Sequence, residues 1–372
     1  MSPNSFTSIS ETTRRRIGLA TALAAGVLIT LCVLEAVLRL LPVRDGLFIG
    51  DPDPGWPGYH YVPHMHFTHS DGWNLENVTH GVTNNMGYVA PFDYIPGDTG
   101  IVVLGDSYVE STMNRYEDSM QGQLAALLPD REPVMNFGYS GASLSDYLGM
   151  TALVRQRFKI DWLVVVIVPG DFVEGYVPEL QFFHWAPDRI PPVQQVPRYT
   201  KSGAMKKAVR TLAIFRYITG QLGATYQSLF GYAQSKVRSG CPAAKLEPGD
   251  EELIQSVMRG FPSAAGIPPS KIILIFDPDI HPLNNTPLRG SRSACTTRDS
   301  LARARLASSA AEYGMHVLDM QATFAAYSSA AHEPVDHPDT HWNATGNRLV
   351  AEKVAKVIGP TQTTIGAAPR LQ

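Results

Sequence analysis

Short apolar runs alternate with helical segments along most of the chain from residue 101 onward. Five apolar runs are short enough for strands, at 101–104, 133–137, 162–168, 272–276 and 316–318. Between and after them, apolar residues recur at helical spacing at 120–128, 145–157, 251–259, 301–313 and 349–357. The continuous, largely β-branched run at 162–168 is typical of a strand buried on both faces. This alternation predicts a three-layer α/β/α domain with a flavodoxin-like parallel sheet.

An uncharged apolar segment precedes this domain. Residues 17–34 contain no charged side chain and are just long enough to cross a bilayer. Three arginines at 14–16 stand before this segment, and such residues favour the cytoplasmic side. We therefore predict a cytoplasmic N-terminus at 1–16, a transmembrane signal anchor at 17–41, and a domain outside the cytoplasm, periplasmic in a Gram-negative bacterium. A cleaved signal peptide and a buried soluble helix are the alternatives.

Composition divides the rest of the chain. Residues 42–98 are rich in Pro, Gly, Asp and Asn, which predicts a loop-rich collar rather than a separate domain. The α/β domain covers 99–360, and its pattern breaks down in an insertion at about 175–248. Aromatic and basic residues at helical spacing in 204–233 fit a lid or membrane-facing flap, or else helices packed on the core. We expect the tail at 361–372 to be disordered.

Charge and cysteine content limit the partners. The 372-residue chain has a net charge of −3 and lacks the basic patch that nucleic-acid-binding proteins usually carry, so we expect no nucleic-acid partner. Of the three cysteines, Cys32 lies in the predicted membrane segment. Cys241 and Cys295 could form a disulfide in an oxidising compartment or remain as thiols. The oligomeric state stays open.

Two distant positions offer the parts of a nucleophilic site. The first predicted strand ends in Gly-Asp-Ser, which places the hydroxyl of Ser107 at the carboxyl edge of the sheet. Near the other end of the chain, Asp339 precedes His341 by two residues, so an imidazole could activate the serine and a carboxylate could orient the imidazole. Asp336 competes for the acid's role, and His337 is interpreted as a bystander. This chemistry requires no metal and no cofactor, and we expect none.

Four short motifs, in this order, resemble the blocks of the SGNH (GDSL-type) hydrolase family: Gly105-Asp106-Ser107, Asn136 to Gly141, Val168 to Phe172, and Asp339 to Asn343. A fifth motif, Asn85-Met86-Gly87-Tyr88, resembles the lead-in of membrane-anchored bacterial members. The resemblance spans roughly residues 84–357 and leaves the insertion unmatched. It implies the SGNH hydrolase fold and an acyl-enzyme mechanism.

The resemblance also implies a role for each matching residue. Ser107 matches the nucleophile, His341 the general acid and base, and Asp339 the acid that orients it. The backbone N–H groups of Ser107 and Gly141 match two donors of the oxyanion hole, which stabilises the charge of the tetrahedral intermediate.

The third block departs from the family pattern. Where the family carries an asparagine donor before an aspartate, this chain has Gly170 before Asp171. Loss of such a donor can cost about 10²–10³ in rate. The Gly170 N–H, another residue such as Asn114, or a water could replace it, or the enzyme could be slow or adapted to transfer. Asp106 is expected to support the turn.

The function that fits these residues best is a serine esterase that removes small acyl groups from cell-envelope carbohydrate or another small ester. The Asp-Thr-His-Trp sequence is also similar to exopolysaccharide O-acetyltransferases such as those of alginate acetylation. In those proteins the element precedes the serine, whereas here it follows, so the order favours the general SGNH hydrolases. A polysaccharide O-acyltransferase with the same triad is the first alternative, and a catalytically weak envelope scaffold is the second.

Two further clusters have weaker signals. Four histidines in the collar could bind a metal, but a solvated loop explains them better: His60, His64, His66 and His69. Asp277, Asp279 and His281 follow a predicted strand and could line a pocket, although ordinary strand-end polarity is the simpler interpretation.

Overall fold

The computed structural model describes residues 10–51, 53, 55–176, 183–186, 189–194, 203, 208–223, 245–278, 298–328, 333–336 and 341–359. Within these ranges the chain forms two units. One contains the described residues of 1–45, 68–78 and 202–233, and the other contains those of 46–67, 79–201 and 234–372. We refer to them as the anchor unit and the catalytic unit, after the roles that the sequence predicts for them, and describe each by itself.

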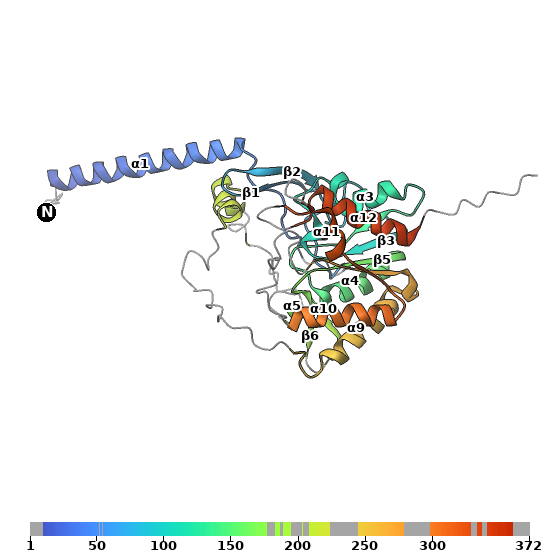
Figure 1. Ribbon diagram of the computed structural model, residues 1–372. Helices are drawn as coiled ribbons and strands as arrows, with labels where there is room; N and C mark the ends of the chain where they lie inside the picture. The colour runs from blue at the N-terminus through green and yellow to red at the C-terminus, as the bar shows by residue number, and fades with distance from the viewer. Residues whose placement is uncertain are drawn as a thin grey trace, which may run out of the picture. The chain divides into compact units, whose positions relative to one another are not determined.

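A five-stranded parallel sheet is the centre of the catalytic unit (Figure 1). Its order is β4-β3-β5-β8-β9, which is the 2-1-3-4-5 order of flavodoxin-like sheets when the five strands are counted along the chain. The strands are β3 (Thr99–Leu104), β4 (Val134–Asn136), β5 (Lys159–Ile167), β8 (Ile272–Phe276) and β9 (His316–Asp319). Order and direction confirm the predicted fold class.

Helices cover both faces of this sheet (Figure 1). One face packs on α4 (Leu144–Arg157), α9 (Asp250–Ala265) and α10 (Arg298–Glu312). The other packs on α3 (Met120–Leu127), α11 (Gln321–Tyr327) and α12 (Ala344–Ile358). The result is the predicted three-layer arrangement.

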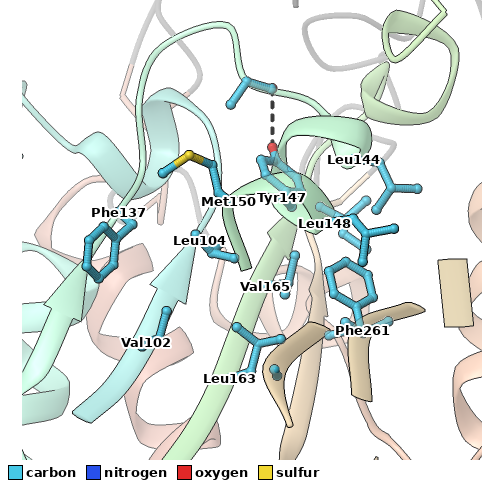
Figure 2. Close-up of a cluster of buried hydrophobic side chains, with 14 of the residues drawn as sticks. Val102, Leu104, Phe137, Leu144, Tyr147, Leu148, Met150, Leu163, Val165 and Phe261 are labelled. Carbon is cyan, nitrogen blue, oxygen red and sulfur yellow. Dashed lines mark hydrogen bonds between the residues drawn. The ribbon is translucent and has the colours of Figure 1, made fainter. Parts of the chain in front are cut away.

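Alternation along the strands builds the two cores. Leu163 and Val165 face the α4 side, while Val164 and Val166 face the α3 side, because successive side chains of a strand point to opposite faces. Figure 2 shows Leu163 and Val165 beside side chains from α4 and beside Phe261. All four strand residues are fully buried, so the continuous apolar run is explained by helices on both sides.

Shorter elements complete the catalytic unit: α2 (Ser107–Glu110), η1 (Tyr116–Asp118), α5 (Asp171–Glu174), β6 (Phe183–Ala186), β7 (Arg189–Gln194) and η3 (Pro269–Lys271). Strands β6 and β7 pair antiparallel inside the predicted insertion. The range predicted to be a collar contains a further two-stranded sheet, β1 (His66–Asp71) with β2 (Glu76–Val82). These two segments have neither an apolar run nor a clear alternation of apolar and polar residues, so their sequence does not predict strands.

The anchor unit contains α1 (Glu11–Leu40), α7 (Ala213–Arg216) and the π-helix η2 (Tyr217–Gln221). Ser10 caps α1, accepting a hydrogen bond from the Thr13 N–H. Helix α1 is long and apolar enough to cross a membrane, with a mean hydropathy of 2.4 over its most apolar window and none of that window buried. By length and composition it is a candidate span, and a signal sequence would fit the same criteria.

Candidate active site

The nucleophile candidate stands at the end of a central strand. Strand β3 ends at Leu104, and Ser107 opens α2 with Asp106 as its N-cap. The Asp106 carboxylate accepts the N–H of Tyr108 at 3.0 Å, which holds the turn between strand and helix. Gly105 allows this turn, because a Cβ there would collide with the side chains of Val109 and Val166.

The structure brings Ser107 and His341 together although 234 positions separate them in the chain. Oγ of Ser107 lies 2.7 Å from Nε2 of His341, which is within hydrogen-bond distance. The imidazole is only 5% exposed, and its ring centroid is 4.6 Å from that of Tyr108. A hydroxyl in contact with a sheltered imidazole is the arrangement that removal of its proton requires.

Two antiparallel backbone contacts hold the loop that carries His341. Val335 and Trp342 form a β-bridge, and the Asp336 N–H donates to the His341 carbonyl at 2.9 Å. Asp336, the competing acid, therefore meets His341 through its backbone. Asp339 and His337 lie outside the described residues, so the role of Asp339 as the orienting acid stays a prediction.

The two predicted donors of an oxyanion hole stand at the start of α2 and in a neighbouring turn. The Ser107 N–H occupies the first position of α2, where a helix makes no internal bond with its N–H. Gly141, the second predicted donor, has a φ of +81°, which favours glycine. Among the described residues, apart from its chain neighbours, no heavy atom lies within 4 Å of the place where a Cβ would stand at Gly141.

The two substitutes considered for the absent asparagine are already engaged in other bonds. The Gly170 N–H donates to the Asp299 carboxylate at 2.7 Å. The side-chain amide of Asn114 donates to Ser111 Oγ at 3.0 Å and to the Trp342 carbonyl at 2.9 Å, which uses both of its hydrogens. Asn114 is thus a brace for the His341 loop, and neither group offers a spare donor in this structure.

A buried carboxylate that the sequence analysis did not single out supports the second block. Glu110 accepts hydrogen bonds from the Tyr61 hydroxyl, the Ser140 hydroxyl and the Ser140 N–H. It is 2% exposed, and burial raises the pKa of its carboxyl. Glu110 ends the short helix that Ser107 begins, so it joins the nucleophile's helix to the turn that holds Gly141.

The motif at Asn85 to Tyr88 contacts Tyr61, whose hydroxyl donates to the Glu110 carboxylate. Gly87 accepts the Tyr61 N–H at 2.9 Å and has a φ of +78°. Any side chain on Gly87 would collide with the Tyr61 carbonyl, which explains the glycine. This part of the resemblance therefore positions the tyrosine that contacts Glu110.

Asp277 contacts Trp342, the residue that follows the candidate base His341. Its Oδ1 accepts the indole N–H of Trp342 at 2.6 Å, and its N–H donates to the Ile167 carbonyl at 2.9 Å. Asp277 is 1% exposed, so the simple interpretation as strand-end polarity is incomplete. Asp279 and His281 lie outside the described residues.

Two further acids, the half-buried Asp106 and the buried Asp171, lie near the candidate nucleophile Ser107. Burial raises the pKa of Asp106, while the Tyr108 N–H and the nearby His341 oppose that rise. Burial also raises the pKa of Asp171 well above its usual range, and the neighbouring Asp106 raises it further. Asp171 accepts the Val168 N–H at 2.9 Å and the Tyr147 hydroxyl at 3.0 Å, so it braces the third block.

The collar histidines do not form a cluster around one point. His60 contacts the Gly58 carbonyl, His64 lies 3.7 Å from Asp93, and His69 lies 3.1 Å from Asp71. In the part of the chain that the structure describes, no group of three or more His, Cys, Asp or Glu residues is arranged to hold a metal ion. Cys241 and Cys295 fall outside that part, so the disulfide stays untested.

Comparison with known families adds to this geometry. Residues 251–371, about a third of the chain, match the family model described as the SGNH hydrolase-like domain of the acetyltransferase AlgX. The predicted resemblance to SGNH hydrolases is confirmed. The matched segment contains the His341 loop, and the Ser107 strand lies before it. No curated protein matches the chain.

Solved structures also align with the chain at low identity. A G-D-S-L lipolytic protein from Veillonella parvula is 13% identical, covers 70% of this chain and 97% of its own, and has a TM-score of 0.36. An acetyl-xylooligosaccharide esterase variant from Geobacillus Stearmophilus is 14% identical, with coverage of 71% and 96% and a TM-score of 0.38. A carbohydrate acetylesterase from Sinorhizobium meliloti is 12% identical, with coverage of 70% and 98% and a TM-score of 0.36.

Proposed function

We propose that the chain is a serine-dependent esterase that removes small acyl groups from cell-envelope carbohydrate. The 2.7 Å contact between Ser107 Oγ and His341 Nε2 carries this proposal. A scaffold protein has no need for a sheltered imidazole in contact with a serine at the carboxyl edge of a parallel sheet.

The reaction has two halves. His341 Nε2 takes the hydroxyl proton as Ser107 Oγ attacks the ester carbonyl, and the N–H groups of Ser107 and Gly141 stabilise the oxyanion. The intermediate expels the sugar alkoxide, which receives the proton from His341, and an acyl-Ser107 ester remains. Water then loses a proton to His341 and attacks the acyl carbonyl. The bond between Ser107 Oγ and the acyl carbon breaks, His341 returns the proton to Oγ, and the acid leaves. Asp339 is the proposed partner of the imidazole in both halves.

A polysaccharide O-acyltransferase is the second candidate, because the matched family model is that of an acetyltransferase. Its first half-reaction would be the same, and a sugar hydroxyl would replace water in the second half. The chain order of serine and histidine favours hydrolysis, whereas the family match favours transfer. The two functions differ in whether water or a sugar hydroxyl attacks the same acyl-enzyme.

The proposed location follows from α1. Its apolar part is preceded by Arg14, Arg15 and Arg16, so we place the N-terminus in the cytoplasm and the catalytic unit on the other side of the membrane. An enzyme tethered there would meet the acylated carbohydrate of the envelope without leaving the membrane.

The test compares Ser107→Ala with Ser308→Ala in the full-length protein. Ser308 is an exposed serine of α10, outside the proposed site. We expect hydrolysis of a short aryl ester to fall by about 10⁴-fold or more in Ser107→Ala and to stay unchanged in the control. A serine-reactive fluorophosphonate should label the native protein and Ser308→Ala alone. Absence of labelling in folded native protein would favour the scaffold.

The same assay with an added oligosaccharide distinguishes the two enzymatic functions. Mass spectrometry should detect free acid as the main product if the esterase proposal is correct. An excess of acylated oligosaccharide over free acid would establish the transferase instead.

A further inference from the structure

Within the anchor unit, a carboxylate of α1 holds the start of a second helix. Glu35 directly follows the uncharged run that ends at Leu34. Its carboxylate accepts the N–H groups of Ala213 at 2.9 Å and Ile214 at 3.0 Å, the first two of α7. Figure 1 shows this segment in yellow beside the C-terminal end of α1. Glu35 thus supplies acceptors for the N-terminus of a helix that begins 178 positions later.

One face of the segment from α7 to η2 is covered. Ala213 is fully buried against Leu38 and Val43, and Ile214 and Tyr217 pack on the same cluster. The Tyr217 hydroxyl donates to the Trp73 carbonyl at 2.7 Å, so the segment is also tied to the loop between β1 and β2. These contacts keep the helix against the end of α1.

The opposite face is apolar, and no described residue covers it. It carries four large apolar residues at spacings of three or four, each 37–53% exposed: Leu212, Phe215, Ile218 and Leu222. Trp73, whose carbonyl accepts the Tyr217 hydroxyl, is 73% exposed in the same unit. A helix that is apolar on both faces requires a second apolar environment, since contiguous exposed apolar surface is unfavourable in water.

The position of Glu35 indicates what covers this face. The membrane-crossing run ends one residue before Glu35, and a charged carboxylate belongs at the edge of the hydrocarbon. The cap therefore places the start of α7 at the level where α1 leaves the bilayer. Trp73 fits the same depth, because tryptophan is enriched at membrane interfaces.

We propose that residues 212–222, with Trp73, form an interfacial platform whose apolar face rests in the headgroup region of the bilayer that α1 crosses. This inference rests on the proposed membrane anchor and is independent of the esterase chemistry. The occupant is the lipid of the leaflet on the catalytic side, and binding follows from apolar area inserted beside an existing span. The platform gives the anchor a second attachment, which limits rotation of α1 about its own axis.

The test places a photo-reactive residue on the platform of the full-length protein. Phe215→p-benzoylphenylalanine is reconstituted in phosphatidylethanolamine and phosphatidylglycerol vesicles, irradiated, and analysed for lipid adducts by mass spectrometry. Val27→p-benzoylphenylalanine reports on the anchor itself, and Lys353→p-benzoylphenylalanine, on an exposed position of α12, measures chance contact. We expect adducts at position 215 at least half as abundant as at position 27 and about tenfold above position 353.

Each other outcome has a defined meaning. Adducts at position 27 with only background at position 215 would overturn the platform and leave the anchor intact. Cross-links from position 215 to a second copy of the chain, or to another part of the same chain, would overturn the lipid occupant. Background at both positions would remove the anchor and the platform together.

The role of Glu35 has its own control. Glu35→Ala removes both acceptors from the start of α7, whereas Glu35→Gln keeps one carbonyl acceptor. Combined with the photo-reactive residue at 215, Glu35→Ala should lower the lipid adducts severalfold, and Glu35→Gln should lower them less. Unchanged adducts in Glu35→Ala would show that Glu35 does not hold the platform.

Discussion

The indole N–H of Trp342 donates a hydrogen bond of 2.6 Å to Oδ1 of Asp277, which joins the loop of the proposed base to the end of β8. Both residues are 1% exposed. Trp342 also packs edge-on against Tyr108, the residue after the proposed nucleophile, with ring centroids 5.3 Å apart. One aromatic side chain therefore links the sheet edge, the serine helix and the histidine loop.

This link predicts that Asp277 is a positioning residue for His341. In Asp277→Ala the buried indole N–H loses its acceptor, which costs about 1–3 kcal/mol and frees the loop. We expect kcat for a short aryl ester to fall about tenfold or more, with a smaller change in KM. Asp277→Asn keeps an oxygen acceptor and should restore most of kcat. Steady-state kinetics and thermal unfolding test this. If Asp277 has a purely structural role, the melting temperature should fall in both variants without a difference in kcat between Asp277→Ala and Asp277→Asn.

The contact between Ser107 and His341 predicts that the two side chains act as a unit. Ser107→Ala and His341→Gln should each lower kcat by about 10⁴-fold or more, and the double variant should be no slower than the slower single one. The reason is that the imidazole has no proton to remove once the hydroxyl is absent. Single-turnover kinetics of the three variants measure this non-additivity. Losses that multiply in the double variant would mean that the residues work independently.

The sheet was predictable because its strands carry a strong local signal. The strand predicted at 272–276 coincides with β8. The run at 162–168 ends one residue after β5 and begins three residues after the start of β5. Both runs are continuous because helices cover both faces of the sheet. The helices 120–128 and 145–157 match α3 and α4 within one residue at each end. By contrast, β1 and β2 consist mostly of polar residues, and no sequence pattern predicted them.

The site was predictable only as far as short motifs describe it. Ser107 and His341 stand in motifs whose order indicated a shared site, and the structure brings them together. Glu110 has its tyrosine partner 49 positions away, and Asp277 has its indole partner 65 positions away. Such pairs have no spacing rule, because the fold rather than the local sequence creates them. Glu110 is followed directly by Ser111 and Thr112, so the local sequence does not mark it as buried.

Glu110 is predicted to maintain the oxyanion turn. In Glu110→Ala the buried hydroxyl of Tyr61 and the hydroxyl of the exposed Ser140 lose their acceptor, so we expect a loss of about 1–3 kcal/mol in the free energy of unfolding, mainly from Tyr61. The Gly141 N–H should move with Ser140, lowering kcat by about tenfold. Glu110→Gln keeps an acceptor oxygen and should retain more of both properties. Thermal unfolding and ester hydrolysis test the pair, and equal activity in Glu110→Ala and native protein would exclude this role.

Asp171 is predicted to make the protein less stable as pH rises. Burial and Asp106 hold the pKa of its carboxyl well above the ordinary aspartate value, so the folded protein retains a proton that the unfolded chain has released. Between those two pKa values the free energy of unfolding therefore falls with rising pH, by up to about 1.4 kcal/mol per pH unit for this one proton. Asp171→Asn keeps an acceptor for the Val168 N–H and the Tyr147 hydroxyl without an ionisable group, so its stability should fall less steeply from pH 5 to 9. Asp171→Ala, which leaves both donors without an acceptor, should be destabilised at every pH. Thermal unfolding of the three proteins in detergent across this range measures the slopes, and parallel curves for native protein and Asp171→Asn would contradict the raised pKa.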